Sequence, residues 1–404
     1  MARHGRVLLF LAAVIVAPRL CALPPMQLFV ELTPTGGVLK PEPGVYAGPV
    51  VIDKAITVDG GGKVTIDGQG EGTVVQLKRA DGAVLRGLKI VNSGGSHDRL
   101  DGAILLEDTN NALIERNLIE EVLFGINLRK SFDNVVRDNS ISSRADTPSL
   151  RGEGLRVWYS SDNLFERNLL QGVRDILVIN SPDNRFVGNR IADSRMGMEL
   201  VFSPGNRILE NRFQRNTSGV VGIYSDDLLI RGNHFTHMRA KTGSALAIKE
   251  SSQVVIERNE VLHCSVGLTV NAPVHPENIL YLRNNRIAYN DVALYFYGEK
   301  GGHVIHGNRF EGNMTAIAVS APTSALANDW SGNHWDGYQG FDDDGDGFGD
   351  TPFSIYLYSD RIWMDRPMTR FFRGSPVLEL IDFMERLAPF SAPFLILRDN
   401  RPLM

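Results

Sequence analysis

Apolar and polar residues alternate along short segments of this chain, and the segments recur at similar intervals. Stretches such as GINLRKSFDN, GLRVWYSSDN and GMELVFSPGN place an apolar residue at every second position over part of their length. A period of two is typical of a β-strand, whereas an amphipathic helix has a period of 3.6. The pattern therefore predicts short strands separated by Gly, Ser-Pro and Asp-Asn turns.

An asparagine follows a second kind of apolar segment, as in ALIERN, NLFERN and NRILEN. Successive asparagines are 22, 29, 21, 22, 22, 26, 26 and 23 residues apart. They are Asn117, Asn139, Asn168, Asn189, Asn211, Asn233, Asn259, Asn285 and Asn308. A base period with occasional additions is typical of a solenoid, whose units stack because none can bury its apolar face alone.

We therefore predict an all-β fold, a right-handed parallel β-helix (a solenoid) of about eleven coils with a C-terminal helical tail. Coils stacked at roughly 4.8 Å would make a rod on the order of 50 Å long. The asparagines are predicted to be structural, because Asn tolerates the left-handed backbone of a tight corner and stacked amides can hydrogen-bond in a ladder. An inward stack is predicted for Ile126, Leu155, Ile176, Met198, Val220 and Leu268.

Four segments are predicted along the chain. Residues 1–22 carry two arginines before an apolar run that is too short for a membrane span, which is typical of an export signal. The coils are expected over residues 23–332, an Asp/Gly-rich terminal loop over residues 333–353 and a tail over residues 354–404. After removal of the signal only Cys264 is left, so no disulfide within the chain is expected.

A helix is predicted over about residues 375–388 of the tail, with Ser375 as N-cap and Pro376 at the first helical position. Its apolar residues recur at helical spacing. Such a helix would cap the open end of the coils or dock onto another protein. The formal net charge of −5 is spread without long runs and gives no electrostatic argument for nucleic acid or an anionic membrane surface.

Three insertions, residues 92–102, 142–154 and 236–244, fall at the same point of the repeat. Stacking would gather them along one edge, which is where solenoids often place function. One interpretation of this edge is a polysaccharide-cleaving or epimerising site, which needs a base and a cation beside the substrate. The residues that could serve are His97, Asp98, Arg99, Asp101, Arg144, Arg151 and Glu153. The alternative is a solvated, charged loop.

A copper site is the second interpretation of the same edge. In register, His237 lies over His263 and Met238 over Cys264, and Met196 occupies the same corner two coils earlier. Imidazole, thioether and thiolate are ligand types suited to Cu(I). Because adjacent residues of a strand point to opposite faces, the alternative is a pair of surface histidines beside core sulfur atoms.

The segment NHWDGYQGFDDDGDGFGDTPF holds Asp342, Asp344, Asp346 and Asp350, with Gly347 after the third of them. Carboxylates at alternate positions, a glycine and a later carboxylate match the start of a calcium loop. Residue 353 is Phe, so the glutamate that completes an EF-hand is absent. We predict a structural Ca²⁺ site here, against the alternative of an acidic turn without a metal.

The asparagine-rich coils followed by GNHWDGYQGFDDDGDGFGDTPF resemble the NosD family, over about residues 27–390. NosD proteins are periplasmic maturation factors of nitrous oxide reductase. The resemblance implies a non-enzymatic role in copper-site assembly, transient contact with copper, and no membrane association except through a permease. The implied partners are an ABC transporter permease and its ATPase, a copper-chaperone lipoprotein and the reductase. Two alternatives remain open: a secreted polysaccharide lyase, epimerase or hydrolase, and a carbohydrate-binding surface module.

Overall fold

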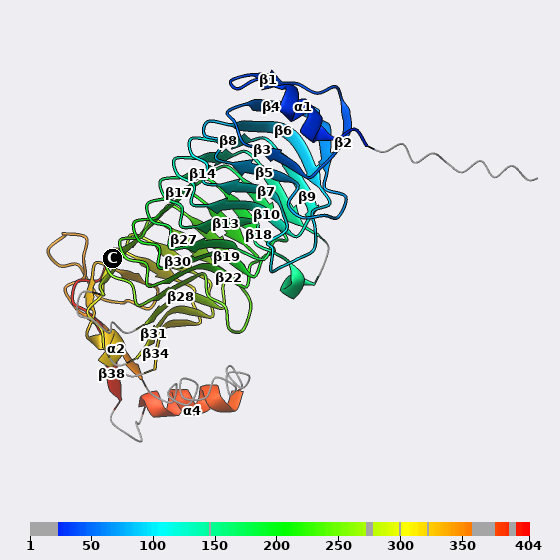
Figure 1. The fold of residues 1–404 in the computed structure, drawn as a ribbon. Helices are drawn as coiled ribbons and strands as arrows, with labels where there is room; N and C mark the ends of the chain where they lie inside the picture. The colour runs from blue at the N-terminus through cyan, green and yellow to red at the C-terminus, as the bar shows by residue number, and fades with distance from the viewer. Residues whose placement is uncertain are drawn as a thin grey trace, which may run out of the picture.

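Short strands wind around a common axis and stack into a rod in the computed structural model (Figure 1). The structure describes residues 23–144, 147–271, 278–298, 300–320, 323–357, 376–387 and 393–404. The predicted export signal, residues 1–22, lies outside the described residues. In the part that is described, no helix is both long and apolar enough to cross a membrane.

Two parallel sheets form the wall of the rod, and each regular coil contributes two strands to sheet A and one strand to sheet B. Sheet B consists of β3 (Val50–Ile52), β5 (Val75–Lys78), β7 (Gly102–Glu107), β10 (Phe124–Arg129), β13 (Leu155–Trp158), β16 (Ile176–Ile179), β19 (Met196–Val201), β22 (Ser218–Ile223), β25 (Leu246–Lys249), β28 (Val266–Asn271), β31 (Val292–Tyr297) and β34 (Thr315–Val319). A coil is therefore a three-sided turn of chain.

Sheet A holds the remaining strands of the coils. They are β1 (Val38–Leu39), β2 (Gly44–Ala47), β4 (Thr57–Asp67), β6 (Val84–Val91), β8 (Leu113–Glu115), β9 (Leu118–Val122), β11 (Val135–Arg137), β12 (Ser140–Ser143), β14 (Leu164–Glu166), β15 (Leu169–Gln171), β17 (Arg185–Val187), β18 (Arg190–Ala192), β20 (Arg207–Leu209), β21 (Arg212–Gln214), β23 (Leu229–Arg231), β24 (His234–Thr236), β26 (Val254–Glu257), β27 (Glu260–Leu262), β29 (Leu280–Arg283), β30 (Arg286–Ala288), β32 (Val304–His306), β33 (Arg309–Glu311), β35 (Asp329–Ser331) and β36 (His334–Trp335).

The predicted β-solenoid is confirmed, and it has about twelve turns rather than the eleven predicted, as the twelve described strands of sheet B indicate. The difference arises at the N-terminal end, where β3 pairs in parallel with β5 although this segment lacks the asparagine of the repeat. A short helix, α1 (Met26–Leu32), covers this end of the rod (Figure 1) and buries Met26 and Val30.

A ladder of buried asparagine side chains runs along one corner of the rod, as predicted. At Asn211, the Oδ1 atom accepts hydrogen bonds from the backbone N–H and the Nδ2 of Asn189, at 2.9 and 3.0 Å. Its Nδ2 donates to Asn233 Oδ1 at 3.0 Å and to the Phe186 carbonyl at 2.9 Å. Each amide therefore satisfies backbone groups that the corner removes from the sheet.

The left-handed backbone of the corner lies one residue earlier than predicted. Glu210 and Arg258, which precede ladder asparagines, have φ angles of 57° and 53°. The asparagine that follows keeps an ordinary backbone because its side chain must point inward to bond the next coil. The predicted inward stack is confirmed, since Ile126, Leu155, Ile176, Met198, Val220 and Leu268 are at most 1% exposed.

The chain end returns to the rod, which the sequence pattern did not predict. After α2 (Thr323–Leu326) and the last coil, β37 (Phe353–Leu357) pairs antiparallel with β38 (Phe394–Asp399). Asp399, which is fully buried, accepts hydrogen bonds from Asn333 Nδ2 at 3.0 Å and Trp335 Nε1 at 3.2 Å. A carboxylate of the tail thus ends the asparagine ladder. Between the two strands lies α4 (Pro376–Leu387), within the range predicted to be helical.

Candidate functional site

The three insertions lie at one corner of the rod, as predicted. They separate β6 from β7, β12 from β13 and β24 from β25, and each therefore joins a sheet A strand to the sheet B strand of its coil. The insertion between β12 and β13 contains a short 3₁₀ helix, η1 (Pro148–Leu150), and two residues outside the described part, 145–146. The corner is the candidate working surface of the protein.

Two charged residues of the first insertion, Arg99 and Asp101, pair with each other. The ring of His97 packs edge-on against Phe124, with ring centroids 5.7 Å apart. Asp101, which is 2% exposed, pairs with Arg99 at 3.2 Å and accepts a hydrogen bond from the Ser96 backbone N–H at 2.9 Å. Asp98 is exposed. These contacts hold the loop in shape.

The two arginines of the second insertion also hold backbone in place. Arg144 Nη2 donates to the carbonyl oxygens of Ser93 and Gly94, both at 2.6 Å, and so joins the second insertion to the first. Arg151 Nη1 donates to the Asp193 carbonyl at 3.3 Å. Guanidinium groups used in this way fix the loops and do not form an obvious catalytic pair.

Glu153 lies in a small cluster of buried charges that the sequence showed only in part. Its side chain is 6% exposed and lies 3.7 Å from Arg174 and 3.8 Å from Arg156. Burial raises the pKa of the Glu153 carboxyl despite these two cations. Next to it Asp175, fully buried, pairs with Arg195. The sequence signal for Asp175 is that an aspartate replaces the glycine that other coils carry at this register.

Four of the five predicted copper ligands divide into two pairs on opposite sides of the wall. His237 and His263 are exposed at the corner, with ring centroids 5.3 Å apart. The next ring along the stack is Tyr289, 5.5 Å from His263. Two neighbouring imidazoles fit the chemistry of copper, whereas the phenol of Tyr289 beside them is not a soft ligand.

Met238 and Cys264 point the other way and are fully buried, with their sulfur atoms 3.8 Å apart. Burial raises the pKa of the Cys264 thiol to about 11, so at neutral pH it is protonated and donates to the Leu262 carbonyl at 3.3 Å. Met196 is partly exposed and lies in register with Ser218, two coils before Met238. The structure therefore does not gather the five residues at one point.

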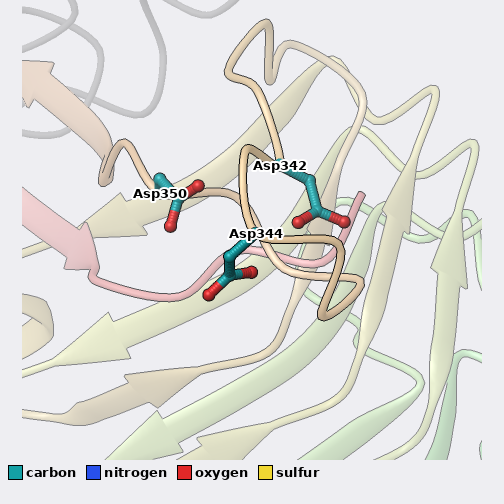
Figure 2. Close-up of side chains that lie close together, drawn as sticks. All are labelled: Asp342, Asp344 and Asp350. Carbon is teal, nitrogen blue, oxygen red and sulfur yellow. The ribbon is translucent and has the colours of Figure 1, made fainter.

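The acidic loop brings three of its four predicted ligands together. Oxygen atoms of Asp342, Asp344 and Asp350 all lie within 4.8 Å of one another, and Figure 2 shows the three carboxylates around the loop. Asp342 also accepts hydrogen bonds from backbone N–H groups of the loop, among them Gly345 at 2.7 Å. Asp346 points elsewhere, because its carboxylate pairs with Arg401 at 2.8 Å.

Comparisons with known proteins agree with this architecture. A family model described as a periplasmic copper-binding protein (NosD) matches residues 139–340, and one described as a right-handed β-helix region matches residues 53–173. A probable ABC transporter binding protein NosD from Pseudomonas aeruginosa is 29% identical over 376 residues, which cover 89% of this chain and 86% of the relative. Both the family's description and the relative's name refer to binding and neither refers to a reaction.

A solved structure shares the fold at low sequence identity. The A-module of a mannuronan C-5 epimerase from Azotobacter vinelandii superposes with a TM-score of 0.56 at 14% identity, covering 71% of this chain and 88% of that one. At this identity the likeness shows the β-helix alone. The NosD family model, in contrast, spans half of the chain. The chain therefore belongs to the NosD family.

Proposed function

We propose that the protein is an exported, periplasmic accessory protein that helps to assemble the copper site of nitrous oxide reductase. It acts with an ABC transporter permease and the ATPase of that transporter, and it exchanges copper with a lipoprotein chaperone. The observation that carries this proposal is the match to a probable ABC transporter binding protein over 89% of the chain. A family described as periplasmic and copper-binding supports the location and the metal.

The helix α4 supplies a surface suited to the permease. Its exposed apolar side chains recur at intervals of three or four residues and so lie along one face. They are Val377, Leu380, Phe383, Met384 and Leu387, between 49% and 71% exposed. An apolar face that is open to solvent indicates a partner. Figure 1 shows α4 at the C-terminal end of the rod, near β38 and α2.

Association with the transporter is tested by co-purification from membranes. The full chain, expressed with the permease and ATPase of its own cell, should elute with both proteins after extraction in mild detergent. Recovery of the chain only as a free monomer, under conditions in which the permease and ATPase remain together, would contradict the proposal.

Copper would be held only briefly during this work, as its cargo. We propose that His237 and His263 receive Cu(I) at the surface. Met238 and Cys264 would take part only after the coil wall opens, because both are buried. The transporter's conformational change would drive release to a partner.

Replacing both His237 and His263 with alanine should weaken Cu(I) binding at least tenfold, because the exposed imidazole pair is lost. The measurement is competition with a colorimetric Cu(I) chelator. A matched control replaces His234 and His306, which are also exposed in part but pair with Glu260 and Asp329. Equal Cu(I) affinities of the parent and the His237/His263 variant would contradict the proposal that these two histidines bind copper.

We also propose that the acidic loop holds a structural Ca²⁺ through Asp342, Asp344 and Asp350, with Asp346 joining if it leaves Arg401. At a calcium concentration 100 times the dissociation constant, binding would stabilise the fold by about 2.7 kcal/mol. Calcium should therefore raise the Tm of the parent by a few degrees and that of Asp344→Asn by less. The control Asp343→Asn, outside the cluster, should respond like the parent; an unchanged parent Tm would contradict the site.

A further inference from the structure

Four arginines on the outer face of sheet A lack the ion pairs that arginines on this face usually make. Arg185 is in register with Arg207, and Arg190 with Arg212, on the same two neighbouring coils. All four side chains are exposed, and none has a carboxylate within 4.0 Å among the described residues. We call these four residues the arginine quartet.

The usual arrangement on this face is an ion pair across the coils. Arg137 pairs with Glu115 at 2.7 Å, and Arg231 pairs with Glu257 at 2.6 Å. Arg286 pairs with both Glu260 and Glu311, each at 2.8 Å. Opposite charges in register stabilise a sheet, and like charges directly opposite destabilise it. Arg286 and Arg309 are also in register, but Glu311 pairs with both of them at 2.8 Å, whereas the quartet has no such carboxylate to offset its repulsion.

Two aliphatic residues, which we call the apolar centre, lie between the two arginine pairs along the chain. They are Val187 and Leu209, which are in register with each other and partly exposed. Leu164 and Leu229 extend the column of Arg185 and Arg207 at either end, since β14 and β23 are the neighbouring strands. The nearest acidic positions along the chain, Asp183 and Glu210, are exposed but make no ion pair with the quartet.

We propose that the quartet and its apolar centre form the docking surface for an acidic protein partner in copper-site assembly. This inference rests on the proposed function. Guanidinium groups bind carboxylates through paired hydrogen bonds, and two arginines one coil apart, at roughly 4.8 Å, offer a double clamp. Arginine is enriched at protein interfaces, and the partly exposed Val187 and Leu209 add apolar area that a protein partner can cover.

The aliphatic centre is what favours a protein over a membrane or an anionic glycan. A polyanion binds a basic surface through charge, and its affinity does not need Val187 or Leu209. An acidic protein face would cover both the cations and the apolar centre, so that its binding would depend on each. The surface lies on sheet A, and its strands β18 and β21 lead into the same corner of their own coils.

The test measures binding of the full chain to four probes: purified nitrous oxide reductase, the purified copper lipoprotein, phosphatidylglycerol vesicles and heparin. The test variant changes Arg185, Arg190, Arg207 and Arg212 to glutamine. A matched control changes Arg137, Arg231, Arg286 and Arg309, which are ion-paired on the same face, and has the same net charge. A third variant, Leu209→Gln, removes part of the apolar centre without a change of charge.

The expected result is that one of the two proteins binds at least tenfold more weakly to the quartet variant, and several-fold more weakly to Leu209→Gln, than to the parent. The control should bind like the parent, and the parent's affinity should fall more steeply with salt than the quartet variant's. Equal binding of the parent and quartet variant overturns the inference and leaves the proposed function intact. A parent that binds neither protein contradicts both, and loss confined to vesicles or heparin overturns the protein partner.

Discussion

Replacing Asn211 with alanine is expected to lower the free energy of unfolding by about 2 to 6 kcal/mol. The substitution removes the bonds of the Asn211 side chain to the backbone N–H of Asn189 and to the Phe186 carbonyl. It also removes one of two bonds at Asn189 Nδ2, which keeps the Phe165 carbonyl, and one of two at Asn233 Oδ1, which keeps the Asn211 backbone N–H. Each buried polar group without a partner costs about 1 to 3 kcal/mol. The measurement is urea-induced unfolding followed by circular dichroism.

Gln214→Ala is the matched control for this variant. Gln214 belongs to the same coil but is exposed, so its replacement should change stability by no more than about 0.5 kcal/mol. Because the contacts of a solenoid are between neighbours, the loss at Asn211 should be greatest in the adjacent coils, which hydrogen exchange can locate. If Asn211→Ala were as stable as Gln214→Ala, the ladder would not be the element that holds the coils together.

Replacing Leu380 and Met384 of α4 with aspartate is expected to reduce recovery of the transporter complex at least tenfold. The two side chains are 57% and 49% exposed, so the isolated protein should keep its stability. In a complex the same positions would bury two unpaired carboxylates against the permease, which is far more costly than leaving them in water. The measurement is the amount of permease that co-purifies with each variant.

The control substitution is Leu32→Asp, which places the same charge on an exposed leucine of α1 at the other end of the rod. The same amount of permease should co-purify with this variant as with the parent. Full recovery of the complex with the α4 variant would show that the permease binds elsewhere on the chain.

Local patterns predicted the coils because every coil must bury one face of its strands and satisfy the backbone groups at its corner. Alternating residues gave the strands, and the asparagine period gave the stacking direction and the buried amides. The N-terminal coil through β3 and β5 was missed because its corner uses no asparagine. The position of the left-handed residue was wrong by one, since Glu210 and not Asn211 adopts it.

The return of the tail could not be predicted from such patterns. β38 is a short apolar segment, and more than thirty residues separate it from its partner strand β37. Its Asp399 accepts a hydrogen bond from Asn333, the last asparagine of the ladder, and no local pattern indicates this contact. For the candidate copper residues, in contrast, the local pattern already offered the observed arrangement as one of its two alternatives. Register placed His237 beside His263 and Met238 beside Cys264, but only the alternation of the strand separates the exposed pair from the buried one.

Ion pairs and other side-chain contacts between neighbouring coils also could not be predicted from the sequence. The arginine quartet and the ion pair of the buried Asp175 could be recognised only from the strand registers. The register decides which side chains of neighbouring coils lie next to each other. Arg144 and Arg151 likewise donate to backbone carbonyl groups of other coils, which the sequence pattern did not indicate.

The most direct test of the proposed function is the copper content of nitrous oxide reductase from cells that lack this protein. Reductase purified from a deletion strain should contain little copper and lack the absorption of its copper centres, and the parent chain should restore both. Reductase that acquires a full complement of copper in the deletion strain would contradict the account.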